Sequence, residues 1–207
     1  SLGTVYFPIS LLVLVIATFL LDMTYLGAVG MLVLGYGDGL AGWIGERYGK
    51  NKIYKNKSLQ GSTAMFISAF VVSFIVMSIF TPSIAISGSI IIAILATAIE
   101  LFTPLDFDNL TVPIGSAAIY YGLIVVGSAA TNLILAAIVL NLLIALAAYK
   151  KHALDSGGTI AALMIGMCIF IFAGMVPWLM LMVFFASSSV ISYFKKEHKI
   201  KLSSEYE

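Results

Sequence analysis

The sequence predicts an all-α fold, a polytopic bundle of about eight membrane-spanning helices, and three observations support this prediction. Of the 207 residues, 61% are hydrophobic and 10% are charged, whereas soluble domains carry about 25% charged residues. The apolar residues gather in runs close to the length of about 20 that a helix needs to cross a bilayer. Runs such as 90–95 are apolar on every side, which disfavours a membrane barrel because barrel strands alternate apolar and polar residues.

The expected spans follow one another with short turns between them. The apolar run 113–149 is divided near Gly127 and Ser128, because a single helix of that length would extend beyond the membrane. The one cysteine, Cys168, excludes an internal disulfide, and a net charge of +1 disfavours a nucleic-acid partner. The eight expected spans are 4–21, 24–44, 62–80, 83–101, 113–127, 130–149, 157–174 and 177–194.

The basic residues predict the orientation of the bundle. With eight spans, the three segments that hold all eleven Lys and Arg lie on one side, and the positive-inside rule places that side in the cytoplasm. The first apolar run has neither a basic leader nor a small-residue cleavage site, so we expect a span and not a signal peptide. The basic segments are 47–57, 150–151 and 195–201, and the expected cytoplasmic parts are both termini and the loops 45–61, 101–112 and 150–156.

Asp38 is the first candidate site residue, because a carboxylate inside a membrane is costly and usually functional. It lies near the cytoplasmic end of the second expected span, in a stretch, 35–45, with five glycines in eleven residues. Each glycine lowers helix propensity by about 1 kcal/mol relative to alanine. Close helix packing through Gly35-xxx-Gly39 would explain the glycines, and so would a backbone opened for a polar ligand that approaches Asp38. The acid in the middle favours the second interpretation.

The loop that follows, 46–62, is basic and ends in Lys57-Ser58-x-x-Gly61-Ser62, directly before the third expected span. Backbone N–H groups at a helix N-terminus attract anions, and lysine and serine side chains add to that attraction. The motif therefore predicts a phosphate site, although its spacing is not that of a P-loop. A topology signal with lipid-headgroup contacts is the alternative interpretation of this loop.

The next cytoplasmic loop carries three acids and no cation: Glu100, Asp106 and Asp108. Carboxylates beside a basic loop suggest a magnesium–nucleotide site, because Mg²⁺ is usually held by one or two carboxylates together with substrate phosphates. A solvated acidic loop that pairs with the lysines is the alternative, but Glu100 ends an apolar run where solvation is poor. Pro104 should end the fourth span, and Pro113 suits the first turn of the fifth.

Several motifs occur in a fixed order along residues 1–127. They are Gly37-Asp38-Gly39-Leu40-Ala41, Gly45-x-Arg47-Tyr48-Gly49-Lys50, Lys57-Ser58-x-x-Gly61-Ser62, Glu100, and Asp108-Asn109-Leu110-Thr111-Val112-Pro113. Together they resemble the phytol kinase and dolichol kinase family. This resemblance implies an integral membrane enzyme that transfers a phosphoryl group from CTP to a lipid alcohol, with phytol or another prenol as the acceptor.

For this reaction the protein has to position the substrates and neutralise charge more than it has to do covalent chemistry. We expect Asp38 and Glu100 to be catalytic, either as Mg²⁺ ligands or by polarising the alcohol, with Asp108 and Asn109 completing the metal site. The CTP phosphates are expected to be held by Gly39, Arg47, Lys57, Ser58, Gly61 and Ser62.

The C-terminal part resembles a different family. Ser156-Gly157-Gly158, Trp178 and the stretch 184–189 are similar to the start of the membrane family that includes the plant phytyl-phosphate kinase. We therefore expect a prenol kinase-like membrane domain at 1–149, without the earliest helix of that family's pattern. A partial second membrane segment is expected at 150–207.

Two other functions remain open from the sequence. A cytidylyltransferase would use the same nucleotide and similar acids, but it would release pyrophosphate where a kinase releases CDP. A non-catalytic transporter or structural subunit could use Asp38 to couple an ion, although transporters usually carry interrupted helices in two related halves, and only one span here is glycine-rich.

Overall fold

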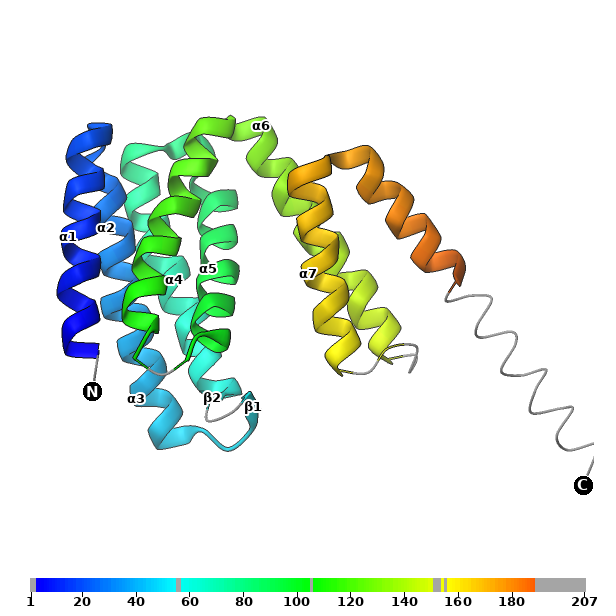
Figure 1. Ribbon diagram of the computed structural model, residues 1–207, viewed down its shortest axis with the longest axis horizontal. Helices are drawn as coiled ribbons and strands as arrows, with labels where there is room; N and C mark the ends of the chain where they lie inside the picture. Colours follow the sequence, from blue (N-terminus) through cyan, green and yellow to red (C-terminus); the bar gives the residue numbers. More distant parts are fainter. Residues whose placement is uncertain (1–2, 55–56, 105, 151–153, 155, 189–207) are drawn as a thin grey trace, which may run out of the picture. The chain divides into compact units, whose positions relative to one another are not determined.

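The computed structural model describes residues 3–54, 57–104, 106–150, 154 and 156–188 (Figure 1). Two compact units divide the chain, one covering residues 1–135 and the other residues 136–207. The division lies inside a helix, and the expected domain boundary at 149–150 stays a prediction. Much of the loop 150–156 and the end of the eighth expected span lie outside the described residues.

The fold class is confirmed, because the described part is made of helices apart from one short hairpin. Five of its helices are long and apolar enough to cross a membrane, so the expected count of eight spans is not confirmed. These five are Gly3–Leu21 (α1), Thr24–Tyr48, Leu59–Phe80 (α4), Pro82–Phe102 and Asp108–Lys150 (α6).

The second of these spans is not one regular helix. An α-helix gives way to a π-helix over the glycine-rich stretch, and a second α-helix continues to the basic loop. The segments are α2 (Thr24–Leu32), η1 (Val33–Asp38) and α3 (Gly39–Tyr48). Glycines lower helix propensity in this stretch, which is where the regular hydrogen-bond pattern changes.

Unit 1 is a bundle built around α4, which packs against η1, α2, α3 and α5 (Ala85–Phe102). Its core includes Met65 and Met77 of α4 and Ile91 and Ile92 of α5, each fully buried. Figure 1 shows α1, α4, α5 and the first part of α6 running side by side, and the strands β1 (Lys52–Tyr54) and β2 (Lys57–Ser58) lie at one end of this bundle.

α6 has a break at Gly127, whose φ of 78° and ψ of 177° belong to a region that only glycine enters readily. The Thr131 hydroxyl donates to the Gly127 carbonyl at 2.8 Å. The break lies where the apolar run 113–149 was expected to divide, so that expectation is confirmed. A continuous helix of 43 residues would measure about 65 Å at 1.5 Å per residue, about twice the apolar thickness of a bilayer.

The expected place of Pro113 in a first turn is wrong. α6 begins at Asp108, because the Phe107 carbonyl already accepts hydrogen bonds from the N–H groups of Leu110 and Thr111. Pro113 therefore lies inside the helix, where its carbonyl would be 2.5 Å from a side chain added at Gly30. The close approach of α2 to α6 at this point depends on that glycine.

Unit 2 contains the end of α6, α7 (Ser156–Ala173) and an apolar helix at Met175–Ser188. The buried side chain of Asn141 donates to the Leu163 carbonyl at 3.4 Å, and Gly166 leaves room for it. The rings of Phe170 and Trp178 meet edge to face at 5.6 Å. The helix boundaries agree with the expected spans at 157–174 and 177–194 to within two residues at each described end.

Candidate functional site

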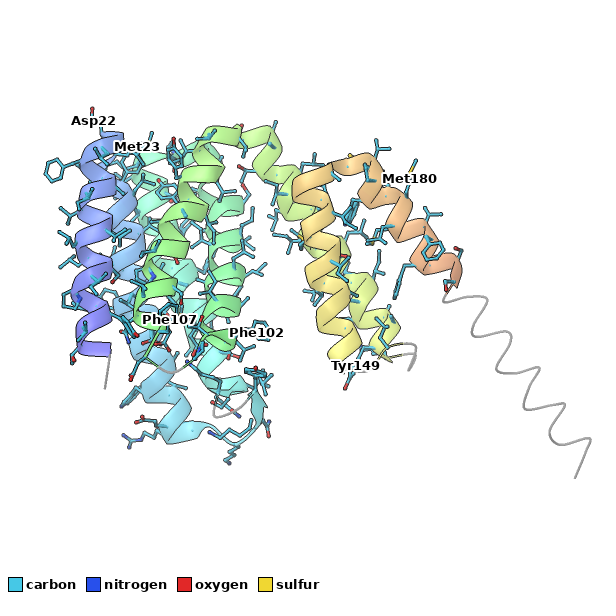
Figure 2. All side chains as sticks on the ribbon, in the orientation of Figure 1. Asp22, Met23, Phe102, Phe107, Tyr149 and Met180 are labelled. Atoms are coloured by element: carbon cyan, nitrogen blue, oxygen red, sulfur yellow. The ribbon has the colours of Figure 1, made fainter. Side chains whose placement is uncertain are left out.

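Lys57 joins the basic loop to the two acidic positions. Its Nζ donates to Glu100 Oε1 at the end of α5 and, at 3.2 Å, to Asp108 Oδ2 at the start of α6. Glu100 is 3% exposed and Asp108 6%, so both carboxylates are shielded from water. The loops that the sequence placed together therefore meet at one end of unit 1. In Figure 2, Phe102 and Phe107 lie at this end and Asp22 at the opposite one.

The ion pairs hold the pKa of Lys57 above its ordinary value. Burial acts in the opposite direction and is the largest single effect, but it is outweighed by the hydrogen bond to Glu100 and by the charges of Glu100 and Asp108. Lys57 is therefore protonated at neutral pH and supplies a fixed positive charge at this end of the bundle.

A short hairpin presents Lys57 to the acids. β1 and β2 pair antiparallel, with Tyr54 opposite Lys57, and the Leu59 N–H donates to the Asn51 carbonyl at 2.9 Å. The Tyr54 ring contacts Phe102, which lies two residues beyond Glu100. The hairpin is thus tied to the same helix end that carries the acid.

Ser58 and Gly61 have structural roles at the start of α4. The Ser58 hydroxyl accepts from the Gly61 N–H at 3.2 Å and caps the helix. A side chain at Gly61 would lie 2.9 Å from the Ala41 carbonyl, so this glycine lets α3 approach α4 closely. Ser62 differs from both, because its Oγ is buried and has no hydrogen-bond partner among the described residues. It is the hydroxyl of the expected phosphate motif whose hydrogen-bonding capacity is unused in this part of the chain.

Asp38 ends the π-helix and interacts electrostatically with Asp108, Lys57 and Glu100. π-Helical turns occur frequently at functional sites. The structure thus joins Lys57, Glu100 and Asp108 by direct contacts, and the charges of all three act on Asp38. These four expected site residues lie on η1, β2, α5 and α6 and come from separate parts of the sequence.

Gly35-xxx-Gly39 does not pack against another helix within the described part of the chain. A side chain built at Gly35, Gly39 or Gly42 would meet no atom of the described residues within 4 Å, and all three residues are exposed. Gly37 is the glycine that packs here, since its added Cβ would lie 2.7 Å from the Met65 sulfur. The backbone beside Asp38 is therefore exposed on its outer side, the side that faces away from α4.

Asn109 and Arg47 do not contact Lys57 in the way that Glu100 and Asp108 do: Asn109 contacts Asp108, and Arg47 contacts two aromatic rings. The backbone N–H of Asn109 donates to Asp108 Oδ1 at 3.1 Å, so Asn109 orients that carboxylate. The Arg47 guanidinium lies 5.9 Å from the Trp43 ring centre and 5.8 Å from that of Tyr48. Among the described residues, none forms a salt bridge with Arg47, and its contacts there are with these two rings.

Of the acids at this end of unit 1, Asp38 and Glu100 are the two that fit Mg²⁺. Within the described part of the chain, no three side chains of His, Cys, Asp or Glu form a metal cluster. Lys57 and Asn109 already engage the oxygens of Asp108, whereas the buried Oε2 of Glu100 has no described partner. Since Mg²⁺ is commonly held by one or two carboxylates plus phosphates, Asp38 and Glu100 fit an ion that arrives with its nucleotide.

Two contributions were missed by the sequence interpretation. Gly45 and Gly49 surround the Ser58 cap, and a side chain at Gly49 would lie 2.1 Å from the Gly45 carbonyl. Their spacing of four residues is a signal of close packing. The aromatic contact between Tyr54 and Phe102 has no comparable signal, because it joins residues 48 positions apart.

Comparisons with known proteins support the resemblance. The chain is 35% identical over 126 residues to a phytol kinase of Synechocystis sp., a match that covers 58% of this chain and 53% of that protein. It is 32% identical over 131 residues to a probable chloroplastic phytol kinase of Triticum aestivum, covering 58% and 43%. It is 37% identical over 97 residues to a dolichol kinase of Schizosaccharomyces pombe, covering 46% and 19%.

These matches confirm the resemblance that the motifs predicted, and the chain spans about half the length of the phytol kinases it matches. Residues 139–207 match a separate family, described as integral membrane protein DUF92. No solved structure gives a significant match.

Proposed function

We propose that this chain forms the catalytic end of a membrane kinase that transfers a phosphoryl group from CTP to a prenol such as phytol or to another lipid alcohol. One observation carries the proposal: Lys57 is held between Glu100 and Asp108 beside Asp38. This occurs in a chain similar to proteins named phytol kinase and dolichol kinase. The positive charge of the lysine suits the phosphates of the nucleotide, and the negative charges of the acids suit the Mg²⁺ ion that phosphoryl transfer uses.

Lys57 and the start of α4 form the phosphate side of the site. The Lys57 ammonium neutralises charge on the nucleotide, and the unpartnered Ser62 hydroxyl donates to a phosphate oxygen. The first turn of α4 adds the positive end of the helix dipole. Asp38 and Glu100 would hold Mg²⁺, which supplies charge neutralisation between the phosphates when it is bound.

The outer side of η1 and α3 suits the lipid acceptor. The bare backbone at Gly35, Gly39 and Gly42 leaves room for a hydrocarbon chain beside Asp38. A chain that enters from the bilayer would place its hydroxyl at the end of the bundle, where the Asp38 carboxylate accepts the hydroxyl hydrogen bond and orients the oxygen for attack.

The test is to incubate the protein in detergent with Mg²⁺, CTP labelled at the γ-phosphate and a panel of lipid alcohols. Label on the lipid together with release of CDP supports the kinase. Release of pyrophosphate supports the cytidylyltransferase instead. Absence of Mg²⁺–CTP stabilisation, together with substrate flux in liposomes, would contradict both and favour a transporter.

The variant Asp38→Asn tests the charge of this acid. It keeps the size of the side chain and removes the charge, so transfer should fall by about 10²-fold or more, and Mg²⁺–CTP should raise the melting temperature less than in wild type because the ion loses one charged ligand. Asp22→Asn is the matched control, because Asp22 lies at the other end of unit 1 and should retain full transfer (Figure 2). Near-normal transfer by Asp38→Asn would rule out the role of this acid.

A further inference from the structure

The continuous helical stretch formed by η1 and α3 has two different sides. The side formed by Gly37, Ala41 and Gly45 packs on α4, where Gly61 and Met65 approach it closely. The other side carries Tyr36, Leu40 and Trp43, which are 57%, 40% and 55% exposed. These three residues are spaced four and three apart, so they form one stripe along the helix.

Arg47 continues the exposed stripe, four residues after Trp43. It is two residues beyond Gly45, which at about 100° per residue places it roughly opposite the side that packs on Ser58 and Gly61. It also lies in the last turn of α3, at the end of the candidate span Thr24–Tyr48. A large exposed apolar side of a membrane-spanning helix is the side that faces lipid. Arg47 therefore emerges toward the lipid at the membrane edge, away from the acids that pair with Lys57.

We propose that Arg47, flanked by Trp43 and Tyr48, binds the phosphate of an anionic phospholipid at the edge of the membrane. The guanidinium forms paired hydrogen bonds with phosphate oxygens, and aromatic rings commonly lie at the level of the headgroups. The rings of Trp43 and Tyr48 hold the guanidinium in place, and no described carboxylate pairs with it. Lys50, exposed three residues on, adds positive charge.

Lipid binding by Arg47 does not depend on the kinase reaction, and it replaces the role expected for Arg47 at the triphosphate. A lipid phosphate and a nucleotide phosphate share the same chemistry, so geometry has to separate them. The charges that would meet the nucleotide gather around Lys57, whereas the stripe that leads to Arg47 is apolar and exposed. The lipid headgroup is the phosphate that this side can reach.

The experiment measures lipid binding to the purified protein by native mass spectrometry, with phosphatidylglycerol and phosphatidylcholine of equal chain length. Wild type should retain phosphatidylglycerol about fivefold more strongly, the contribution of one basic residue near an anionic surface. Arg47→Gln should remove most of this preference, and Arg47→Lys should keep part of it because the charge remains but the planar group is lost. Lys50→Gln also removes one positive charge, but at a residue that is not flanked by two aromatic rings. It should keep most of the preference for phosphatidylglycerol.

A parallel titration with Mg²⁺–CTP distinguishes the two sources of phosphate. Arg47→Gln should keep wild-type nucleotide stabilisation. Equal retention of both lipids by wild type, or an unchanged preference in Arg47→Gln, would overturn the proposal. Loss of nucleotide stabilisation in Arg47→Gln with the lipid preference intact would also overturn it and return Arg47 to the nucleotide site.

Discussion

The Tyr54 ring packs edge-on against the Phe102 ring, with 5.6 Å between the ring centres. Tyr54 faces Lys57 across the hairpin, and Phe102 follows Glu100 by two residues. The contact therefore connects the strand that presents the cation to the helix that carries its acid. Edge-to-face aromatic pairs contribute about 0.5–1.5 kcal/mol beyond area burial, enough to restrict a hairpin of this size.

Removal of the Tyr54 ring should loosen Lys57. In Tyr54→Ala the hairpin loses its anchor on α5, so Lys57 should react several times faster with an amine reagent, measured by peptide mass spectrometry. Tyr54→Phe keeps the ring and should keep the slow reaction. Equal rates in wild type and Tyr54→Ala would show that the ion pairs alone hold Lys57.

Removal of the Lys57 charge should destabilise unit 1. Lys57→Met leaves Glu100 and Asp108 buried without their cation, and the expected loss in unfolding free energy is about 2–3 kcal/mol, because the lysine is partly exposed. The measurement is thermal or denaturant unfolding in detergent. Lys50→Met, at an exposed position, should change the free energy by less than about 0.5 kcal/mol.

Bulk at Gly39 should affect the lipid acceptor and not the fold. Gly39→Leu adds a side chain where no atom of the described residues lies within 4 Å, so the melting temperature should not fall. If the acceptor chain lies along this backbone, the KM for phytol should rise roughly tenfold or more while the KM for CTP stays constant.

Gly122→Leu is the matched control for Gly39→Leu, because Gly122 lies in α6 and has equally open space around it. It should leave both KM values unchanged. The acceptor path along η1 and α3 is contradicted if the two variants behave alike.

Gly61→Ala should lower the melting temperature, because its Cβ would press on the Ala41 carbonyl.

Topology can be tested with single cysteines in a Cys168→Ala background. Positions Asn51 and Phe107 belong to the end of unit 1 that carries Lys57, and Ser83 follows the opposite end of α4. An impermeant thiol reagent should label the first two only from the cytoplasmic side and Ser83→Cys only from the other side. Labelling of Asn51→Cys and Phe107→Cys from different sides would contradict the site, because Lys57 bridges their two loops.

The sequence predicted the parts of the fold that depend on composition and on single strong signals. The all-α class follows from the apolar runs, and the break at Gly127 follows from the length of one run. Asp38 and Glu100 were found because acids are rare in such runs. The hairpin was not predicted, because strands of three and two residues are too short to show a period.

The pairing inside the site was only partly predictable. The basic and acidic loops were expected to meet, but the loop has several lysines and no local pattern identifies Lys57 as the one that reaches Glu100, 43 residues away. The glycines at 35–45 showed that the helix is irregular, but not which of them pack. That distinction depends on the Met65 side chain of another helix, which contacts Gly37 and leaves Gly35 and Gly39 open.

The unpartnered hydroxyl of Ser62 sets stability against activity at this position. A buried hydroxyl without a partner costs about 1–3 kcal/mol in the protein without ligand, and a bound phosphate would recover that cost. Alanine at this position would relieve the cost and would also suit the helix better. Random variants selected only for heat resistance should therefore accumulate Ser62→Ala, whereas selection for growth that depends on the enzyme should retain the serine.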